Sequence, residues 1–115
     1  MRNKIIVEKI LKYISKVIDY TKEIEYDTFR TNSILVEACV FNLSQIGELA
    51  NKVSPEFQDA NPLIPWRMIY GLRNRIVHDY GNVDLEVIYD TLTNDIPWLI
   101  NKLEKSERKV KIWNT

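Results

Sequence analysis

Apolar side chains recur every three or four residues through most of this 115-residue chain, a spacing typical of amphipathic helices. No stretch shows the alternation of a half-buried strand, and three glycines and four prolines leave little material for the turns of a sheet. The pattern predicts an all-α fold. The expected apolar faces are Ile6, Ile10, Tyr13, Ile14, Val17 and Ile18; Leu35, Cys39, Leu43, Ile46, Leu49, Ala50 and Val53; Trp66, Ile69, Tyr70, Leu72, Ile76 and Val77; and Leu85, Ile88, Leu92, Ile96, Leu99 and Leu103.

We expect four main helices, over residues 3–24, 31–53 and 65–80 and from a cap at Asn82 to about residue 103. The apolar phase of the last helix continues across Pro97, which predicts one kinked helix and not two. Short connections between long amphipathic helices favour an antiparallel up-and-down bundle. The wide apolar faces leave surface that two protomers can share, so we expect a homodimer.

The length fits a single domain over residues 1–115. Either Asp27 or Thr31 is expected to cap the second helix, and Ser54 to begin at most a short turn before a loop at 59–62. The apolar face is lost after Leu103, so residues 105–115 are expected to fray. The basic side chains of this tail, Lys105, Arg108, Lys109 and Lys111, are interpreted as a solvated end.

Sixteen basic and sixteen acidic residues cancel, so any surface for RNA must be local. The single cysteine, Cys39, excludes an internal disulfide, fits a reducing compartment and is expected in the core. We find no signal-peptide pattern and no apolar run near 18 residues. A cytoplasmic protein without a membrane partner is expected.

The segment 64–82 holds the only histidine, His78, with Arg73, Asn74 and Tyr80 at fixed offsets. On a helical wheel of about 100° per residue, Arg73 falls in the middle of the apolar face, with Tyr80 nearly above it, and His78 falls about 140° away. A guanidinium that faces the core is costly unless it is paired or lines a cavity or interface. Arg73 therefore needs an explanation other than packing.

Several enzyme classes are excluded by what is missing. The chain has no glycine-rich phosphate loop, no dinucleotide fingerprint and no Gly-x-Ser-x-Gly elbow. One histidine and one distant cysteine do not form a recognisable zinc site, so no metal or cofactor is expected. Arg73 suits phosphate binding, His78 suits proton transfer, and Asn74 lies four residues before His78 and can orient it. This set fits metal-free RNA cleavage with the 2′-hydroxyl as nucleophile, at a composite cleft in a dimer.

Structural alternatives remain open for each residue. A histidine near a helix C-terminus is often a favourable partner of the helix dipole. Arg73 could instead form a buried ion pair with Glu48 or Asp79. Trp66 and Tyr70 fit a core better than a platform for stacked bases.

The stretch Arg73 to Tyr80 resembles the Arg-x4-His-x-Tyr motif of HEPN domains in its Arg-Asn-x3-His form. Its surroundings are similar to the HepT-like branch, once catalogued as a domain of unknown function. The similar features, which span residues 6–103 with the helical pattern, are Ile46-Gly47-Glu48, Pro65-Trp66 and Val83-Asp84.

This resemblance implies an all-helical domain that dimerises with its motifs facing a shared cleft. It implies a metal-independent ribonuclease, the toxin of a toxin–antitoxin pair, in which Arg73 and His78 are catalytic and Asn74 and Tyr80 support them. The implied partner is a nucleotidyltransferase antitoxin that silences the toxin by AMPylation of Tyr80. Some HEPN domains do not cut RNA, so the alternative is a non-catalytic domain that binds nucleotide or docks a nucleotidyltransferase.

Overall fold

Every regular element in the described part of the chain is helical. The computed structural model describes residues 2–77 and 84–113, with side chains described over 2–72 and 84–105. The all-α prediction is therefore confirmed. The elements are α1 (Arg2–Thr21), α2 (Tyr26–Arg30), α3 (Ser33–Ala50), α4 (Pro55–Ala60), α5 (Trp66–Val77), α6 (Leu85–Asp90), the π-helical segment η2 (Thr91–Asp95) and α7 (Ile96–Trp113).

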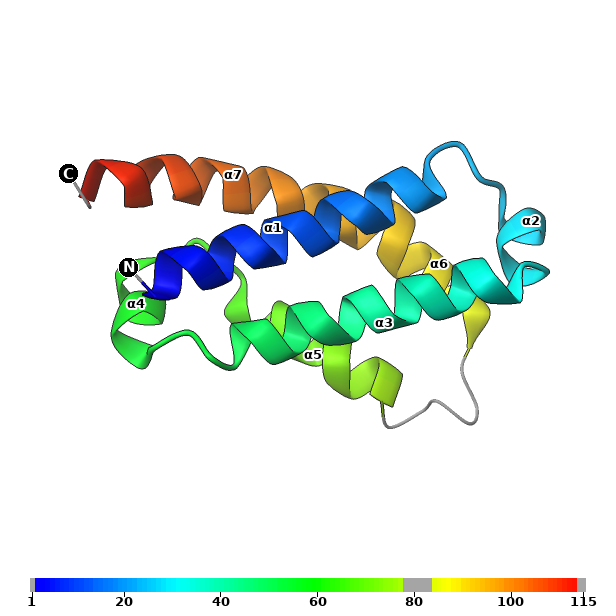
Figure 1. Cartoon of the computed structure of the whole chain (residues 1–115), viewed down its shortest axis with the longest axis horizontal. Coiled ribbons are helices and arrows are strands. Elements are labelled where there is room, and N and C mark those ends of the chain that lie inside the picture. The colour runs from blue at the N-terminus through cyan, green and yellow to red at the C-terminus, as the bar shows by residue number, and fades with distance from the viewer. Residues whose placement is uncertain (1, 78–83, 114–115) are drawn as a thin grey trace.

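The long helices pack side by side around one apolar core. Helix α1 packs along α3 and α7, and α3 also packs along α5. Figure 1 shows that α1 and α7 run in opposite directions, so both termini lie at the same end of the molecule. Helix α3 thus packs between the α1–α7 pair and α5, the helix that carries Arg73 and Asn74.

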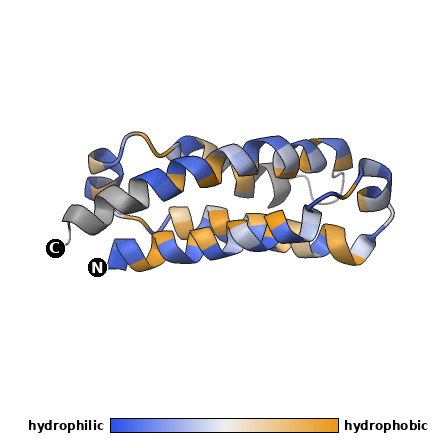
Figure 2. Cartoon of the chain, turned by 90° about the horizontal axis from the view of Figure 1, so that it is seen from above, coloured by the Kyte–Doolittle hydropathy of each residue, from blue (hydrophilic) through white to orange (hydrophobic). Residues whose placement is uncertain are grey.

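The apolar faces predicted from sequence form most of this core. Figure 2 shows apolar and polar residues alternating along the long helices, as helical periodicity requires. Leu35, Leu49, Leu85, Tyr13 and Ile18 are half-buried at its margin. The predicted residues that are buried are Ile6, Ile10, Ile14, Val17, Cys39, Leu43, Ile46, Ala50, Val53, Trp66, Ile69, Leu72, Ile88, Leu92, Ile96, Leu99 and Leu103.

The helical run continues without interruption from α6 through η2 into α7, as predicted across Pro97. Proline has no N–H to donate and its ring crowds the carbonyl one turn earlier. The chain adjusts just before it: the Ile96 N–H bonds the Thr91 carbonyl, five residues back. The wider π turn keeps Leu92, Ile96 and Leu99 buried on both sides of the proline.

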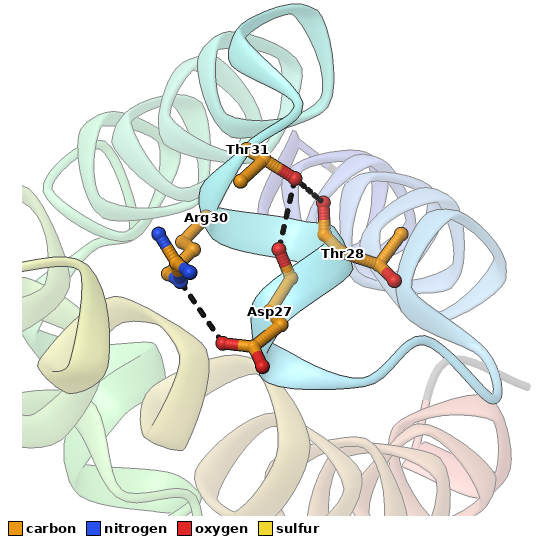
Figure 3. A network of polar contacts seen from close by, with 4 residues as sticks. All are labelled: Asp27, Thr28, Arg30 and Thr31. Carbon is orange, nitrogen blue, oxygen red and sulfur yellow. Dashed lines mark hydrogen bonds and ion pairs between the residues drawn. The ribbon is translucent and has the colours of Figure 1, made fainter.

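Helix α2 was not expected, because the sequence between the first two long helices is mostly polar. Its apolar residue, Phe29, is fully buried, and Tyr89 of α6 packs against both Phe29 and Tyr26. Figure 3 shows the polar side of α2, where Arg30 pairs with Asp27 at 2.9 Å and the Thr31 hydroxyl donates to backbone carbonyls of α2. These local bonds and the buried ring stabilise a single helical turn.

The predicted cap of α3 was wrong: neither Asp27 nor Thr31 caps it. The Asn32 side chain accepts the Leu35 N–H at 3.0 Å instead. Similarly, the cap of α6 is Asp84, whose carboxylate accepts the Glu86 and Val87 N–H groups. The expected cap Asn82 lies outside the described residues.

Ser54 caps α4 as predicted, and its hydroxyl accepts the Phe57 N–H at 3.2 Å. Asn3 of α1 donates to the Ser54 hydroxyl and accepts the Ser54 N–H, which fixes this end. The helix continues to Ala60, so Asp59 and Ala60 are helical and not part of the expected loop. At the C-terminus, α7 continues to Trp113, past the point where we expected fraying.

Helix α3 is long and apolar enough to cross a membrane by length and composition alone, contrary to our expectation that no such stretch exists. Core helices of soluble proteins pass the same test. In this fold α3 packs against both α1 and α5, and its buried residues include Cys39, Leu43 and Ile46. Core packing therefore accounts for the residues that α3 buries, which make up 39% of this stretch.

Candidate functional site

The N-terminal end of α5, the helix that carries the motif, is fixed by Trp66. The indole is buried, its Nε1–H donates to the Asn61 carbonyl at 3.1 Å, and Phe57 of α4 packs against it edge to face. The Ile69 N–H bonds the Pro65 carbonyl and closes the first turn. The Pro-Trp pair therefore sets where α5 begins and ties the helix to the α4 connection.

A second tie joins α5 to α4 one turn later. The Gln58 side chain donates to the Tyr70 hydroxyl and, at 3.1 Å, to the Val53 carbonyl. Tyr70 is half-buried against the core, as is Met68. The interpretation of Trp66 and Tyr70 as core residues is therefore confirmed.

The buried face of α5 consists of Trp66, Ile69 and Leu72. At 3.6 residues per turn, position 73 lies between the directions of Trp66 and Ile69, so its register belongs to this buried face. Arg67, on the opposite arc, is exposed as predicted. The helix register is therefore the one from which the sequence predicts a core-facing direction for position 73, and the placement of the Arg73 side chain stays a prediction.

The opposite side of α5 has open space at Gly71. A Cβ built on Gly71 would meet nothing within 4 Å. Gly71 shares this side with exposed Arg67, one turn earlier, and with position 74, one turn later. A second macromolecule could approach the helix backbone here more closely than at any bulky residue. Sequence reasoning missed Gly71, and its only signal was a glycine inside a strong helical pattern.

Arg73 and Asn74 lie in the last part of α5, and their side chains are outside the described residues. His78, Asp79 and Tyr80 are outside the described residues altogether. The arrangement of Arg73, His78, Asn74 and Tyr80 around one phosphate therefore stays a prediction.

The segment 78–83 connects two helices that are each anchored to the core. On its N-terminal side, α5 packs against α3. On its C-terminal side, Asp84 caps α6 and the Tyr89 hydroxyl donates to the Ile24 carbonyl at 2.5 Å. Sequence reasoning noted Asp84 beside the motif but did not identify it as the cap that fixes this end.

Helix α3 contributes the Ile-Gly-Glu segment. Ile46 and Gly47 are buried, and Glu48 is half-buried and makes a polar contact within the chain. The neighbouring Asn42 is buried and donates to the Ala38 carbonyl at 2.7 Å. An ion pair between Arg73 and either Glu48 or Asp79 stays an untested alternative.

Cys39, on the buried face of α3, has a thiol pKa raised to about 11 by burial. A thiol with such a pKa stays protonated at neutral pH and is a poor nucleophile. Its assignment to the core is confirmed. Among the residues that the structure describes, no three His, Cys, Asp or Glu side chains come close enough to hold a metal ion.

Comparison with known proteins identifies the family. The family model described as Ribonuclease HepT-like matches residues 10–106, so the chain belongs to this family. The chain is 32% identical over 99 residues to "Probable ribonuclease HepT" of Thermococcus cleftensis, covering 86% of this chain and 90% of that one. It is 30% identical over 105 residues to "Putative RNase TTE0752" of Caldanaerobacter subterraneus, covering 91% and 94%.

A third relative, "Putative RNase MJ1216" of Methanocaldococcus jannaschii, is 32% identical over 96 residues, which cover 84% of this chain and 79% of that one. No solved structure gives a significant match. The resemblance inferred from the motif and its flanks is therefore confirmed at the level of the family.

Proposed function

We propose that this chain is a metal-independent endoribonuclease and the toxin of a toxin–antitoxin pair. The observation that supports the proposal is an intact Arg73-to-Tyr80 motif at the end of α5, in a member of the ribonuclease HepT-like family. Three relatives carry RNase or ribonuclease in their names. The register of position 73 on the buried face of α5 adds a physical reason, because packing alone would select a leucine there.

In the proposed reaction, Arg73 binds the scissile phosphate and stabilises the charge that develops on it. The 2′-oxygen attacks phosphorus, the bond to the 5′-oxygen breaks, and a 2′,3′-cyclic phosphate and a 5′-hydroxyl form. His78 transfers the proton that the 2′-hydroxyl loses and the 5′-oxygen gains. Asn74 orients the imidazole, and Tyr80 supports phosphate binding.

We propose that the active form is a homodimer of antiparallel bundles, with a cleft shared by two α5 helices. On one helix, positions 73 and 78 point about 140° apart. A second copy could supply the complementary residue from the side of α5 on which Gly71 leaves open space. Each composite site would then use Arg73 of one chain and His78 of the other.

We further propose a nucleotidyltransferase antitoxin that transfers AMP from ATP to the Tyr80 hydroxyl, with pyrophosphate as the leaving group. The adenylyl group adds bulk and negative charge beside the phosphate site, which opposes RNA entry. Mass spectrometry of this chain co-expressed with the nucleotidyltransferase tests the assignment. Tyr80→Phe should abolish the modification, and Tyr20→Phe, which removes an exposed hydroxyl elsewhere, is the control that should keep it. Modification that persists in Tyr80→Phe would refute this assignment.

The nuclease assignment is tested by incubating purified protein with single-stranded RNA in EDTA. We expect cleavage by the wild type and a loss of at least about 100-fold in His78→Ala, since general acid–base catalysis contributes that much. Arg73→Ala should lose comparable activity. Arg67→Ala, which removes an exposed arginine from the same helix, is the matched control and should stay active.

Full activity in His78→Ala would refute the mechanism. A folded wild type that cuts no RNA but binds nucleotide or a nucleotidyltransferase would instead support the non-catalytic alternative.

A further inference from the structure

The charged residues of this chain are unevenly distributed between its helices, although its net charge is zero. Helices α1 and α7 each contain five basic and two acidic residues. Together they hold ten of the sixteen basic residues and four of the sixteen acidic ones, a net charge of +6. The rest of the chain therefore carries −6, and α3 contains two acidic residues and no basic one.

The fold brings these two basic helices into contact. Helices α1 and α7 pack against each other, although their sequences lie at opposite ends of the chain (Figure 1). Packed helices lie about 8–10 Å apart, close to the screening length of about 8 Å at physiological salt. Their charges therefore act together on a polyanion, which neither helix would attract as strongly alone.

The described lysines recur at helical spacing along both helices. On α1, Lys9, Lys12 and Lys16 are exposed at spacings of three and four residues. On α7, Lys102 and Lys105 occupy the same spacing, with Lys102 half-buried. Lysines at this spacing offer repeated phosphate contacts along a strand.

Aromatic rings accompany these lysines. Trp98 is 49% exposed on α7, and the Lys102 ammonium lies 5.6 Å from the centroid of its ring. On α1, the Lys16 ammonium lies 5.4 Å from the ring of Tyr13. Tyr13 is half-buried, so the exposed Trp98 is the ring that offers a face to unpaired bases, which stack on aromatic side chains in proteins that bind single strands.

We propose that the α1–α7 helix pair is an RNA-binding surface, separate from the motif on α5, that takes single-stranded RNA through lysine–phosphate contacts and stacking on Trp98. Helix α3 lies between this pair and α5 in the packing order. The surface would therefore hold a part of the RNA that is not being cut. The proposal rests on the proposed function for its choice of ligand, and it revises the expectation that the basic tail is only a solvated end.

The test measures binding of a labelled 2′-O-methyl oligouridylate, which has no 2′-hydroxyl to attack phosphorus and so reports binding without cleavage. The variants are Lys12→Gln/Lys16→Gln, Lys102→Gln/Lys105→Gln and Trp98→Ala. Matched controls are Lys22→Gln/Lys52→Gln, two exposed lysines outside the pair, and Phe41→Ala, which removes an exposed ring from α3.

We expect each lysine pair variant to bind more weakly and to lower the slope of log affinity against log salt by up to about 1.4, about 0.7 for each phosphate contact. Trp98→Ala should weaken binding about fivefold or more with little change in that slope. Both controls should bind like the wild type.

Equal losses in the control lysines, or no loss in any α1 or α7 variant, would overturn the proposal. Tighter binding of polyglutamate than of the RNA would assign the surface to an acidic protein and overturn it as well. Cleavage of a short RNA is assayed separately. A protein that binds through this surface but does not cut keeps the inference while the proposed nuclease fails.

Discussion

At the scale of single residues, the contrast between Cys39 and Arg73 shows how position decides chemistry. Cys39 is buried on α3, whereas for position 73 a core-facing direction is predicted from the helical register alone. The thiol of Cys39 loses little by burial, because it stays neutral and packs as a small apolar group. A guanidinium cannot become neutral in the same way, so the register of position 73 requires a compensating charge. That charge is a carboxylate in a structural pair or a phosphate in a functional site.

We predict that the folded state protects Cys39 from ionisation and that this protection costs stability at high pH. The thiol pKa is 9.0 ordinarily and about 11 in the fold. Because the thiol pKa is higher in the folded state than in the unfolded state, ionisation favours unfolding. The stability of the neutral buried thiol is therefore fully present below pH 9 and is lost as pH rises through 11. Between these values the wild type should lose about 2 to 3 kcal/mol of unfolding free energy relative to Cys39→Ala, as two pKa units require.

Urea denaturation of both proteins across this pH range measures the difference, in which the shared lysine and tyrosine titrations cancel. Parallel stability curves for the two proteins would contradict the prediction.

At the scale of elements, α5 is anchored at its beginning and on one face, and left open on the other. Trp66 and Tyr70 tie it to α4, while Ile69 and Leu72 bury its inner face. The outer side around Gly71 has free space. A glycine in a helix interior normally costs stability, so a bare position on the motif helix fits close approach of a second molecule.

We predict that Gly71→Ala stabilises the isolated protomer by about 0.5 to 1 kcal/mol, because alanine loses less entropy in a helix and its methyl group meets no neighbour. The reverse change Ala38→Gly, at a half-buried position inside α3, is the matched control and should destabilise the fold by a similar amount.

Urea midpoints at low protein concentration measure both effects. A destabilised Gly71→Ala protomer would show that the space beside α5 is closed in solution. If the substitution stabilises the protomer but weakens self-association, a partner chain uses this side of the helix.

At the scale of the whole molecule, the packing order separates two surfaces. The basic pair α1–α7 and the motif helix α5 are connected through the acidic, apolar α3. Such an arrangement suits a protein that holds RNA on one surface and cuts it at another.

We predict that mixing two inactive variants restores RNA cleavage if the site is composite. A heterodimer of Arg73→Ala and His78→Ala chains contains one site in which Arg73 and His78 are both intact, on different chains. Activity should therefore rise from background on co-refolding, up to about half of the wild-type activity per heterodimer.

Homodimers of each variant are the controls, and light scattering checks that they form. No recovery with confirmed heterodimers would mean that Arg73 and His78 act within one protomer.

Much of the fold and the family could be predicted from sequence, whereas the arrangement of the site residues stays a prediction. Helical periodicity is a local property, so the buried faces of α1, α3, α5 and α7 followed from residue spacing alone. The same spacing placed Arg67 on the exposed side of α5, as the structure confirms, and the inner direction that it predicts for Arg73 stays a prediction. The family followed from the motif and its flanks, because side chains at fixed offsets carry chemistry that composition does not.

Only the tertiary structure decided the rest, since it depends on contacts between residues far apart in the chain. The polar connection between the first two long helices forms α2 because the core beside Tyr89 buries the ring of Phe29. Asn3 fixes the N-terminal end of α4 because the start of α1 lies beside Ser54 in the fold. The charges of α1 and α7 cancel against the acidic residues in any count along the sequence. They become a basic surface only because the fold packs the first and last helices together.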